Sequence, residues 1–297
     1  MSQLPARNPD QLGTPLRSFV SALAVILGLL LSAIAVPAIW VDSNIVQEDG
    51  FAALAAPLGK DPTFQKRLAT AAVASIDTAG SIPGPLSELV RPVLESAAAS
   101  LTGLPGYPAA WEETLRKSHR LNFAAPATLP PDADSATSVT LDVAPLVALV
   151  TKQVSAKAGV PLEAPAQTLV NIGQSNQRQL IERVAVYAPV GYSLAIGAGI
   201  AFLLALLVAR RRWKVLAGIG IGALALAGLW NLGSSWASDA VVGTASGNEV
   251  ADLFKREFVA ASTAGFGSWI LAAAITGAAL LAAGLVAGII GARARKG

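Results

Sequence analysis

Four uncharged, apolar stretches stand out along the chain of 297 residues, at 18–41, 184–209, 215–236 and 262–292. A transmembrane helix needs about 20 such residues, because each adds about 1.5 Å to its length. Residues 42–183 contain no comparable run and are expected to lie in water. The pattern predicts an α-helical membrane protein with four transmembrane helices and one large domain between the first two.

Helical periodicity dominates the first part of residues 42–183. A helix is expected to start at Asp61 and Pro62, because Asp accepts hydrogen bonds from free N–H groups and Pro fits the first helical position. Its apolar stripe recurs every four residues up to Gly80: Phe64, Leu68, Ala72 and Ile76. Two further helices are expected, at 85–101 and at about 108–121.

The second part of this segment has a different texture. Residues 124–136 are rich in Pro, Asp and Ala and predict a loop. Residues 138–143 and 167–172 are rich in β-favouring side chains and are predicted to form strands. A helical stretch at 145–158 separates them. We therefore expect a mostly helical α+β domain, and a last helix from 177 to 186 that leads into the second span.

The loop at 237–261 holds one more amphipathic helix. Residues 246–249 form a capping box, and one apolar face follows it. That face consists of Val250, Leu253, Phe254, Phe258 and Val259. The helix is expected either on the outer leaflet or docked under the large domain, and its balanced charge favours docking.

Basic residues set the expected orientation, since Lys and Arg close to a span resist translocation. The segments 1–17, 210–214 and 293–297 hold nine basic residues and one acidic residue, whereas 42–183 and 237–261 are both net acidic. We expect a plasma-membrane protein with both termini in the cytoplasm and the large domain outside. The pI of about 9.3 then reflects topology, and a nucleic-acid partner is not expected.

The first apolar run has two interpretations. Ala33, Ile34 and Ala35 would suit a signal-peptidase site. The run is longer than the apolar region of a signal peptide, and Trp40 stands at its outer end, where aromatic anchors lie. An uncleaved span is the expectation, and a cleaved signal peptide is the alternative.

The spans contain small residues four positions apart and no Asp, Glu, Lys, Arg or His, Asn231 being their most polar residue. The small residues are Ala24, Gly28 and Ser32; Gly191, Ala195 and Gly199; Gly218 and Gly222; Ala273 and Gly277; and Gly284 and Gly288. They indicate either a tight four-helix bundle or a dimerisation face, unless they only reflect abundant Ala and Gly. Ion-coupled transport needs intramembrane ionisable groups and is disfavoured.

Composition also limits the chemistry of the outer domain. With no Cys and one His, the chain offers no thiolate or multi-histidine metal site, and no cofactor or metal is expected. The candidate ligand-binding residues lie on one expected helix, and all of them except Trp111 would bind an anionic headgroup or polymer. They are Trp111, Arg116, Lys117, His119 and Arg120. His119 as a surface or capping residue is the leading interpretation, His119 as a catalytic base is an alternative, and Glu112 and Glu113 are expected to pair with Arg116 and Lys117.

Three segments together resemble a known family. APLGKDPTFQ (56–65), WEETLRKSH (111–119) and VTLDVAP (139–145), with the spans around them, are similar to uncharacterised four-span integral membrane proteins of high-GC Gram-positive (actinobacterial) bacteria. The resemblance implies a multi-pass plasma-membrane protein with one extracytoplasmic domain, and it implies no activity.

These observations favour a non-enzymatic membrane protein that presents an extracytoplasmic interaction or ligand-binding domain at the cell envelope. Its expected partners are the lipid bilayer and either envelope proteins or a second copy of itself. One alternative is the transmembrane subunit of an ABC-type transport or mechanotransmission complex, although its inner segments are short. A second alternative is a membrane-bound hydrolase that uses His119.

Overall fold

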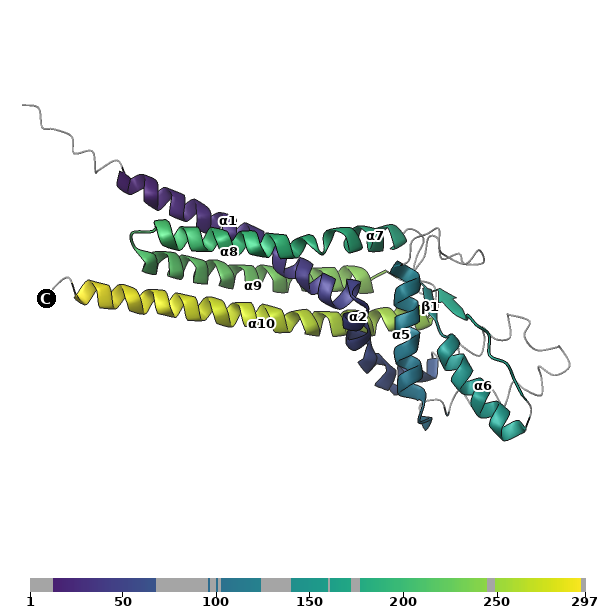
Figure 1. Ribbon diagram of the computed structural model, residues 1–297. Coiled ribbons are helices and arrows are strands. Elements are labelled where there is room, and N and C mark those ends of the chain that lie inside the picture. The colour runs from purple at the N-terminus through teal and green to yellow at the C-terminus, as the bar shows by residue number, and fades with distance from the viewer. Residues whose placement is uncertain are drawn as a thin grey trace, which may run out of the picture. The chain divides into compact units, whose positions relative to one another are not determined.

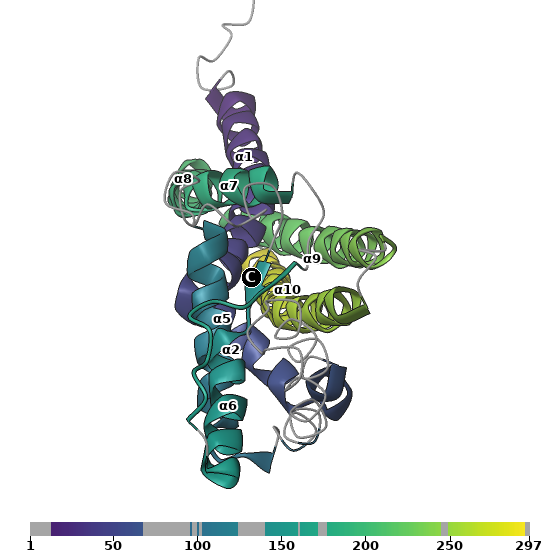
Figure 2. The same ribbon diagram turned by 90° about the vertical axis from the view of Figure 1, so that its right-hand side faces the viewer.

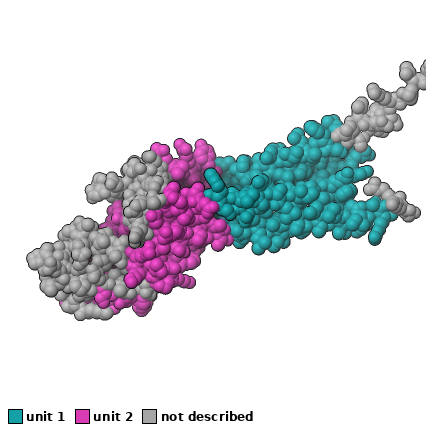
Figure 3. Space-filling view, turned by 180° about the vertical axis from the view of Figure 1, so that it is seen from behind, with its two compact units in different colours: residues 1–40, 189–236, 265–297 teal, residues 41–188, 237–264 magenta. Residues whose placement is uncertain are grey.

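The computed structural model describes residues 13–67, 96, 100, 103–123, 140–159, 161–171, 177–244 and 249–294 (Figure 1). The chain forms two compact units, coloured separately in Figure 3. Unit 1 comprises residues 1–40, 189–236 and 265–297, and unit 2 comprises residues 41–188 and 237–264.

Long apolar helices make up unit 1. They are α1 (Gly13–Val41), α8 (Val190–Val208), α9 (Arg212–Val242) and α10 (Glu249–Arg293), of which α1, α9 and α10 also reach into unit 2. Four helical segments are long and apolar enough to span a membrane, at Leu16–Val46, Gln179–Val208, Arg212–Val242 and Asp252–Arg293. The prediction of four spans is confirmed.

The surface of unit 1 is apolar. Large aliphatic side chains on every one of its helices are half exposed or more, including Ile34, Ile196, Leu232 and Leu271 at 61–69%. Such a surface is costly in water and suits a helix in contact with lipid tails. Hydrophobic burial therefore contributes little between these helices, and close packing has to hold them together.

Glycines mark where the helices of unit 1 approach most closely. A Cβ on Gly220 would lie 2.5 Å from the carbonyl oxygen of Gly277, and a Cβ on Gly284 would lie 2.7 Å from the nitrogen of Ala217. Likewise, Gly28 faces the ring of Phe202. Gly191 meets the backbone of α1, Gly222 meets Leu29 and Gly288 meets the ring of Trp213.

The other small residues of the expected rows differ. Ala24, Ser32, Ala195 and Ala273 are half-buried, and the Ser32 hydroxyl donates to the carbonyl oxygen of Gly28 within α1. Gly199 and Gly218 would place a Cβ in open space, so the expectation that they pack against another helix does not hold within one chain. Four-residue spacing identifies a row of small residues, and it does not identify the face that a neighbouring helix covers.

Unit 2 is built around helix α5 (Tyr107–Phe123), which packs against α2 (Glu48–Ala55) and α6 (Ala144–Ala158) (Figure 2). Before α2 the chain makes the π-helical turn η2 (Asp42–Val46), and after it the 3-10 turn η3 (Ala56–Lys60). The buried core draws on all of these helices, on the strands and on the first turns of α10. Its fully buried large side chains include Phe64, Leu115, Leu141, Leu146 and Val147.

A two-stranded sheet completes this unit. Strands β1 (Thr140–Asp142) and β2 (Leu169–Asn171) pair antiparallel, with Leu141 opposite Val170. The predicted strand, helix, strand order is confirmed, as are the helices now seen as α5, α6 and α7 (Gln177–Tyr187). The Asp61 carboxylate accepts a 2.7 Å hydrogen bond from the Phe64 N–H and caps the predicted helix, whose continuation beyond residue 67 lies outside the described residues. The same is true of the expected loop at 124–136 and nearly all of 85–101.

Two boundaries differ from the sequence-based expectation. The helix at the second span is interrupted. Helix α7 ends at Tyr187, and Pro189, which has no N–H to donate, precedes α8, although the apolar segment Gln179–Val208 includes parts of both helices. The amphipathic helix expected in 237–261 is not separate from the fourth span, since α10 runs unbroken from Glu249 to Arg293 and no Pro interrupts it. Its side chains Leu253 and Phe254 are buried in the core of unit 2, as expected for docking on protein.

Candidate functional site

Trp111 is a core residue of unit 2. Its indole N–H donates to the carbonyl oxygen of Ala55 at 3.3 Å, and the edge of the Phe64 ring packs on it with the ring centres 5.2 Å apart. A Cβ on Gly59 would overlap the indole, so Gly is required there for the close approach of η3. Only 2% of the surface of Trp111 is exposed, and its contacts join α5 to α2 and η3.

His119 lies on the same helix and is also buried, with 6% of its surface exposed, so its interpretation as a surface residue is wrong. Its Nε2 is 3.0 Å from the carbonyl oxygen of Ile45, which can only accept, so Nε2 carries the proton. The ring stacks on Phe123 at 4.3 Å and meets Phe51 at 5.1 Å between centres. Burial lowers the pKa of His119 below its usual value, and the hydrogen bond with Ile45 opposes this shift. The imidazole is therefore neutral at pH 7 and ties α5 to η2.

Arg116 and Arg120 belong to an ion-pair cluster that links α5 to α2. The Arg116 guanidinium lies 2.6 Å from Asp49, 3.0 Å from Glu112 and 3.4 Å from Glu48. The Arg120 guanidinium lies 2.9 Å from Glu48 and 3.1 Å from Glu113. These ion pairs raise the pKa of Arg116, that with Asp49 most strongly.

This cluster bears on the expected anion site. The predicted pair of Glu112 with Arg116 is confirmed, whereas Glu113 pairs with Arg120 rather than with Lys117. Lys117 is half-buried and has no ion pair within the described part of the chain. Because the two guanidinium groups already face four carboxylates, an anionic ligand would have to compete with them. The anion site stays a prediction, and its surroundings disfavour it.

Polar side chains on the opposite side of α5 hold strand β1, and sequence reasoning did not single them out. The Asn122 amide donates to the Thr140 carbonyl oxygen at 2.7 Å and accepts from the Thr140 N–H at 3.0 Å. One turn earlier, the Ser118 hydroxyl oxygen accepts from the Asp142 N–H at 2.9 Å. The signal in the sequence was the i, i+4 spacing of Ser118 and Asn122, which places both on one face of the helix. Both residues are buried.

Asp142 is the buried carboxylate of this region. Its Oδ1 accepts hydrogen bonds from the N–H of Ala144 at 3.0 Å and of Thr168 at 3.1 Å. The first contact satisfies the start of α6, and the second fixes the residue before β2. Asp142 thus has a structural task at the junction of both strands and α6.

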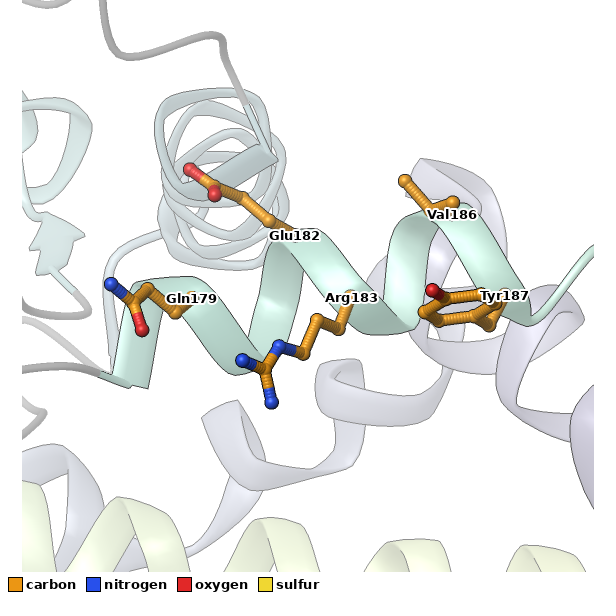
Figure 4. Close-up of a pocket in the computed structure, with 5 residues that line it drawn as sticks. All are labelled: Gln179, Glu182, Arg183, Val186 and Tyr187. Atoms are coloured by element: carbon orange, nitrogen blue, oxygen red, sulfur yellow. The ribbon is translucent and has the colours of Figure 1, made fainter.

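The exposed face of α7 forms an open hollow of about 410 Å³ within unit 2. Figure 4 shows Gln179, Arg183 and Tyr187 at four-residue spacing along the helix, with Glu182 and Val186 beside them. Val186 and Tyr187 are 67% and 68% exposed, and Leu180 on the same helix is 59% exposed. Helix α7 thus combines apolar, aromatic and charged side chains on its accessible surface.

Among the described residues, no group of three or more His, Cys, Asp or Glu side chains is placed to hold a metal ion. Comparison with protein-family models, with curated proteins and with solved structures finds no match for this chain.

Proposed function

We propose that this chain is a non-enzymatic, multi-pass protein of the plasma membrane that presents unit 2 outside the cell as an interaction domain. The exposed face of α7 carries the proposal. It offers large uncovered side chains, Leu180, Val186 and Tyr187, at the start of the second candidate span, Gln179–Val208, with polar and charged side chains beside them.

The partner that fits this face is a protein surface. Glu182 and Arg183 lie among the apolar side chains, and charged groups are costly in a hydrocarbon layer. Tyr and Arg next to aliphatic side chains are typical of protein interfaces. The partner is either another envelope protein or a second copy of this chain.

The placement of unit 2 outside the cell rests on charge. Arg210 and Arg211 lie between α8 and α9, Arg212 and Lys214 lie in the first turn of α9, and basic segments of this kind are retained in the cytoplasm. A plasma membrane of actinobacterial type is what the resemblance of residues 56–65, 111–119 and 139–145 implies.

The contacts of His119 support a non-enzymatic role. A general base needs a ring nitrogen within reach of a substrate. Here Nε2 is engaged with Ile45, and Phe51 and Phe123 pack on the ring. Only Nδ1 could then act as a base, so the hydrolase alternative requires a substrate to reach this nitrogen on a residue that is 6% exposed. The ABC-type alternative requires a cytoplasmic ATPase to bind the short inner segments.

Photo-crosslinking in native membranes tests the proposal. A photoreactive side chain at Tyr187 should give a covalent adduct with a protein, which mass spectrometry identifies as an envelope protein or as the chain itself. The same side chain at Lys152, exposed on α6, is the control and should not give that adduct. Leu180→Glu should abolish the adduct if α7 forms the contact.

Two outcomes would contradict the proposal. Adducts at Tyr187 with lipid alone would place α7 against the bilayer. Recovery of a cytoplasmic ATPase with the intact chain would favour the ABC-type alternative.

A further inference from the structure

Exposed basic side chains gather at one end of unit 1. Figure 1 shows the start of α1, the turn between α8 and α9 and the end of α10 at this end. The residues, called here the inner basic cluster, are Arg17, Arg210, Arg211, Arg212, Lys214 and Arg293.

Helix packing fixes the central part of this cluster. The Trp213 ring lies against Gly288, where a Cβ would be 3.0 Å from it, and the next turn of α9 packs on Gly284. The first turn of α9 is therefore held against the last turns of α10, close to Arg293. The Lys214 ammonium lies 5.6 Å from the centre of the Trp213 ring. The cluster is thus built on contacting helices.

The charges of the cluster are not neutralised within the described parts of unit 1. No ion pair joins Arg210, Arg211 or Arg212 to a carboxylate there, and the first turn of α9 contains no acidic residue. In unit 2, by contrast, Arg116 and Arg120 are both ion-paired. Cations at a helix N-terminus oppose the helix dipole, and an anion at this position would relieve the repulsion.

The expected depth of the cluster in the bilayer indicates which anion it binds. Trp213 stands at the boundary between the charged turn and the apolar run that starts at Val215, and Trp side chains prefer the headgroup level of a bilayer. Guanidinium groups beside it lie at the level of lipid phosphates and can bind them through paired N–H donors.

We infer that the inner basic cluster binds the phosphate groups of anionic phospholipids and so couples unit 1 to acidic membrane. This inference does not depend on the contacts proposed for α7. It concerns the other unit, and its failure would leave those contacts unaffected.

Lipid retention by the full chain tests the inference. The chain is placed in nanodiscs of phosphatidylcholine and phosphatidylglycerol in equal amounts, released, and analysed by native mass spectrometry for bound lipid. We expect phosphatidylglycerol to be enriched about tenfold over phosphatidylcholine, since each cation near an anionic surface contributes severalfold. The variant R210Q/R211Q/R212Q/K214Q should lose most of this enrichment.

Matched variants separate charge at this site from charge in general. The set K60Q/R67Q/K152Q/R256Q also removes four positive charges, from exposed positions of unit 2, and should retain the enrichment. The set R210K/R211K/R212K keeps the charges and should retain most of it. Equal thermal midpoints of all variants would show that each is folded.

Three results would overturn the inference. One is equal retention of both lipids by the unaltered chain. Another is equal loss in the unit 2 control set. The third is displacement of phosphatidylglycerol by inorganic phosphate at about its physiological, millimolar concentration, which would identify a site for soluble phosphate instead.

Discussion

The side chain of Asn122 and the main chain of Thr140 exchange two hydrogen bonds, 2.7 Å from the amide nitrogen to the carbonyl oxygen and 3.0 Å from the Thr140 N–H to the amide oxygen. A helix residue thus pairs with β1 in the way that a third strand would. Because Ser118 accepts from the Asp142 N–H on the same side, α5 covers this edge of the sheet. An uncovered edge would invite pairing with another chain.

Replacing Asn122 by Ala should destabilise unit 2 strongly. The substitution leaves the buried N–H and carbonyl oxygen of Thr140 without partners, at about 1–3 kcal/mol for each unsatisfied group. Chemical denaturation of the purified chain in detergent, followed by Trp fluorescence, measures the loss.

Asn231→Ala is the matched control, since Asn231 is exposed on α9. It should leave the stability of unit 2 unchanged. An Asn122→Ala chain as stable as the original would show that the pairing with Thr140 contributes nothing.

Replacing Gly59 by Ala should displace the Trp111 indole. The added methyl overlaps a buried ring that is held by Ala55 and Phe64, and overpacking of this kind costs about 1–3 kcal/mol. We expect a lower denaturation midpoint. Gly103→Ala, where the methyl meets open space, should be close to neutral. The same loss in both variants would argue against a specific contact with Trp111.

The sequence predicted which segments are important in this core better than it predicted what their residues do. Residues 56–65, 111–119 and 139–145 carry the family resemblance, and the described residues of all three segments contribute to the core around α5. His119 is predicted as a ligand-binding candidate because it lies on a basic helix face, and Trp111 because it belongs to a segment that carries the family resemblance. Their contacts with Ala55 and Ile45 depend on segments more than 50 residues away in sequence, which local spacing does not reveal.

Unit 2 should lose stability as the pH falls below about 6.5. Burial lowers the pKa of His119 in the folded chain, so the unfolded chain, with an ordinary pKa of about 6.5, binds the proton first. The stabilisation is complete above that pH and declines through weakly acidic pH. Thermal midpoints measured from pH 7.5 to about pH 5.5 follow the decline.

His119→Gln isolates this effect, because the chain has one His and Gln can still donate to Ile45. The variant should show a flatter dependence over the same range. An unchanged dependence in His119→Gln would assign the titration to another group.

Gly220→Ala should destabilise the chain, and Gly218→Ala should not. A methyl on Gly220 would meet backbone atoms of Gly277 and Leu281 and force α9 and α10 apart, whereas Gly218 faces open space. Ala favours a helix over Gly by up to about 1 kcal/mol, so Gly218→Ala should be neutral or stabilising. Thermal unfolding in detergent compares them, and equal midpoints would contradict the observed packing of α9 on α10.

The membrane part illustrates what composition can and cannot predict. Four apolar runs sufficed for four spans, because hydrocarbon thickness sets their length. The ends of the helices were less predictable, because charged residues mark the edge of the hydrocarbon layer and not the end of a helix. Helix α10 continues to Glu249 because its first turns pack Leu253 and Phe254 into the core of unit 2.

Substituted-cysteine labelling tests the central claim most directly, namely that unit 2 lies outside the cell and the α8–α9 turn inside. The chain has no cysteine, so a single one can be placed without background. Lys152→Cys on α6 and Arg211→Cys in the turn are both exposed. In intact spheroplasts, a membrane-impermeant maleimide should label Lys152→Cys, and should label Arg211→Cys only after permeabilisation. Labelling of Arg211→Cys in intact spheroplasts, with Lys152→Cys protected, would contradict the account.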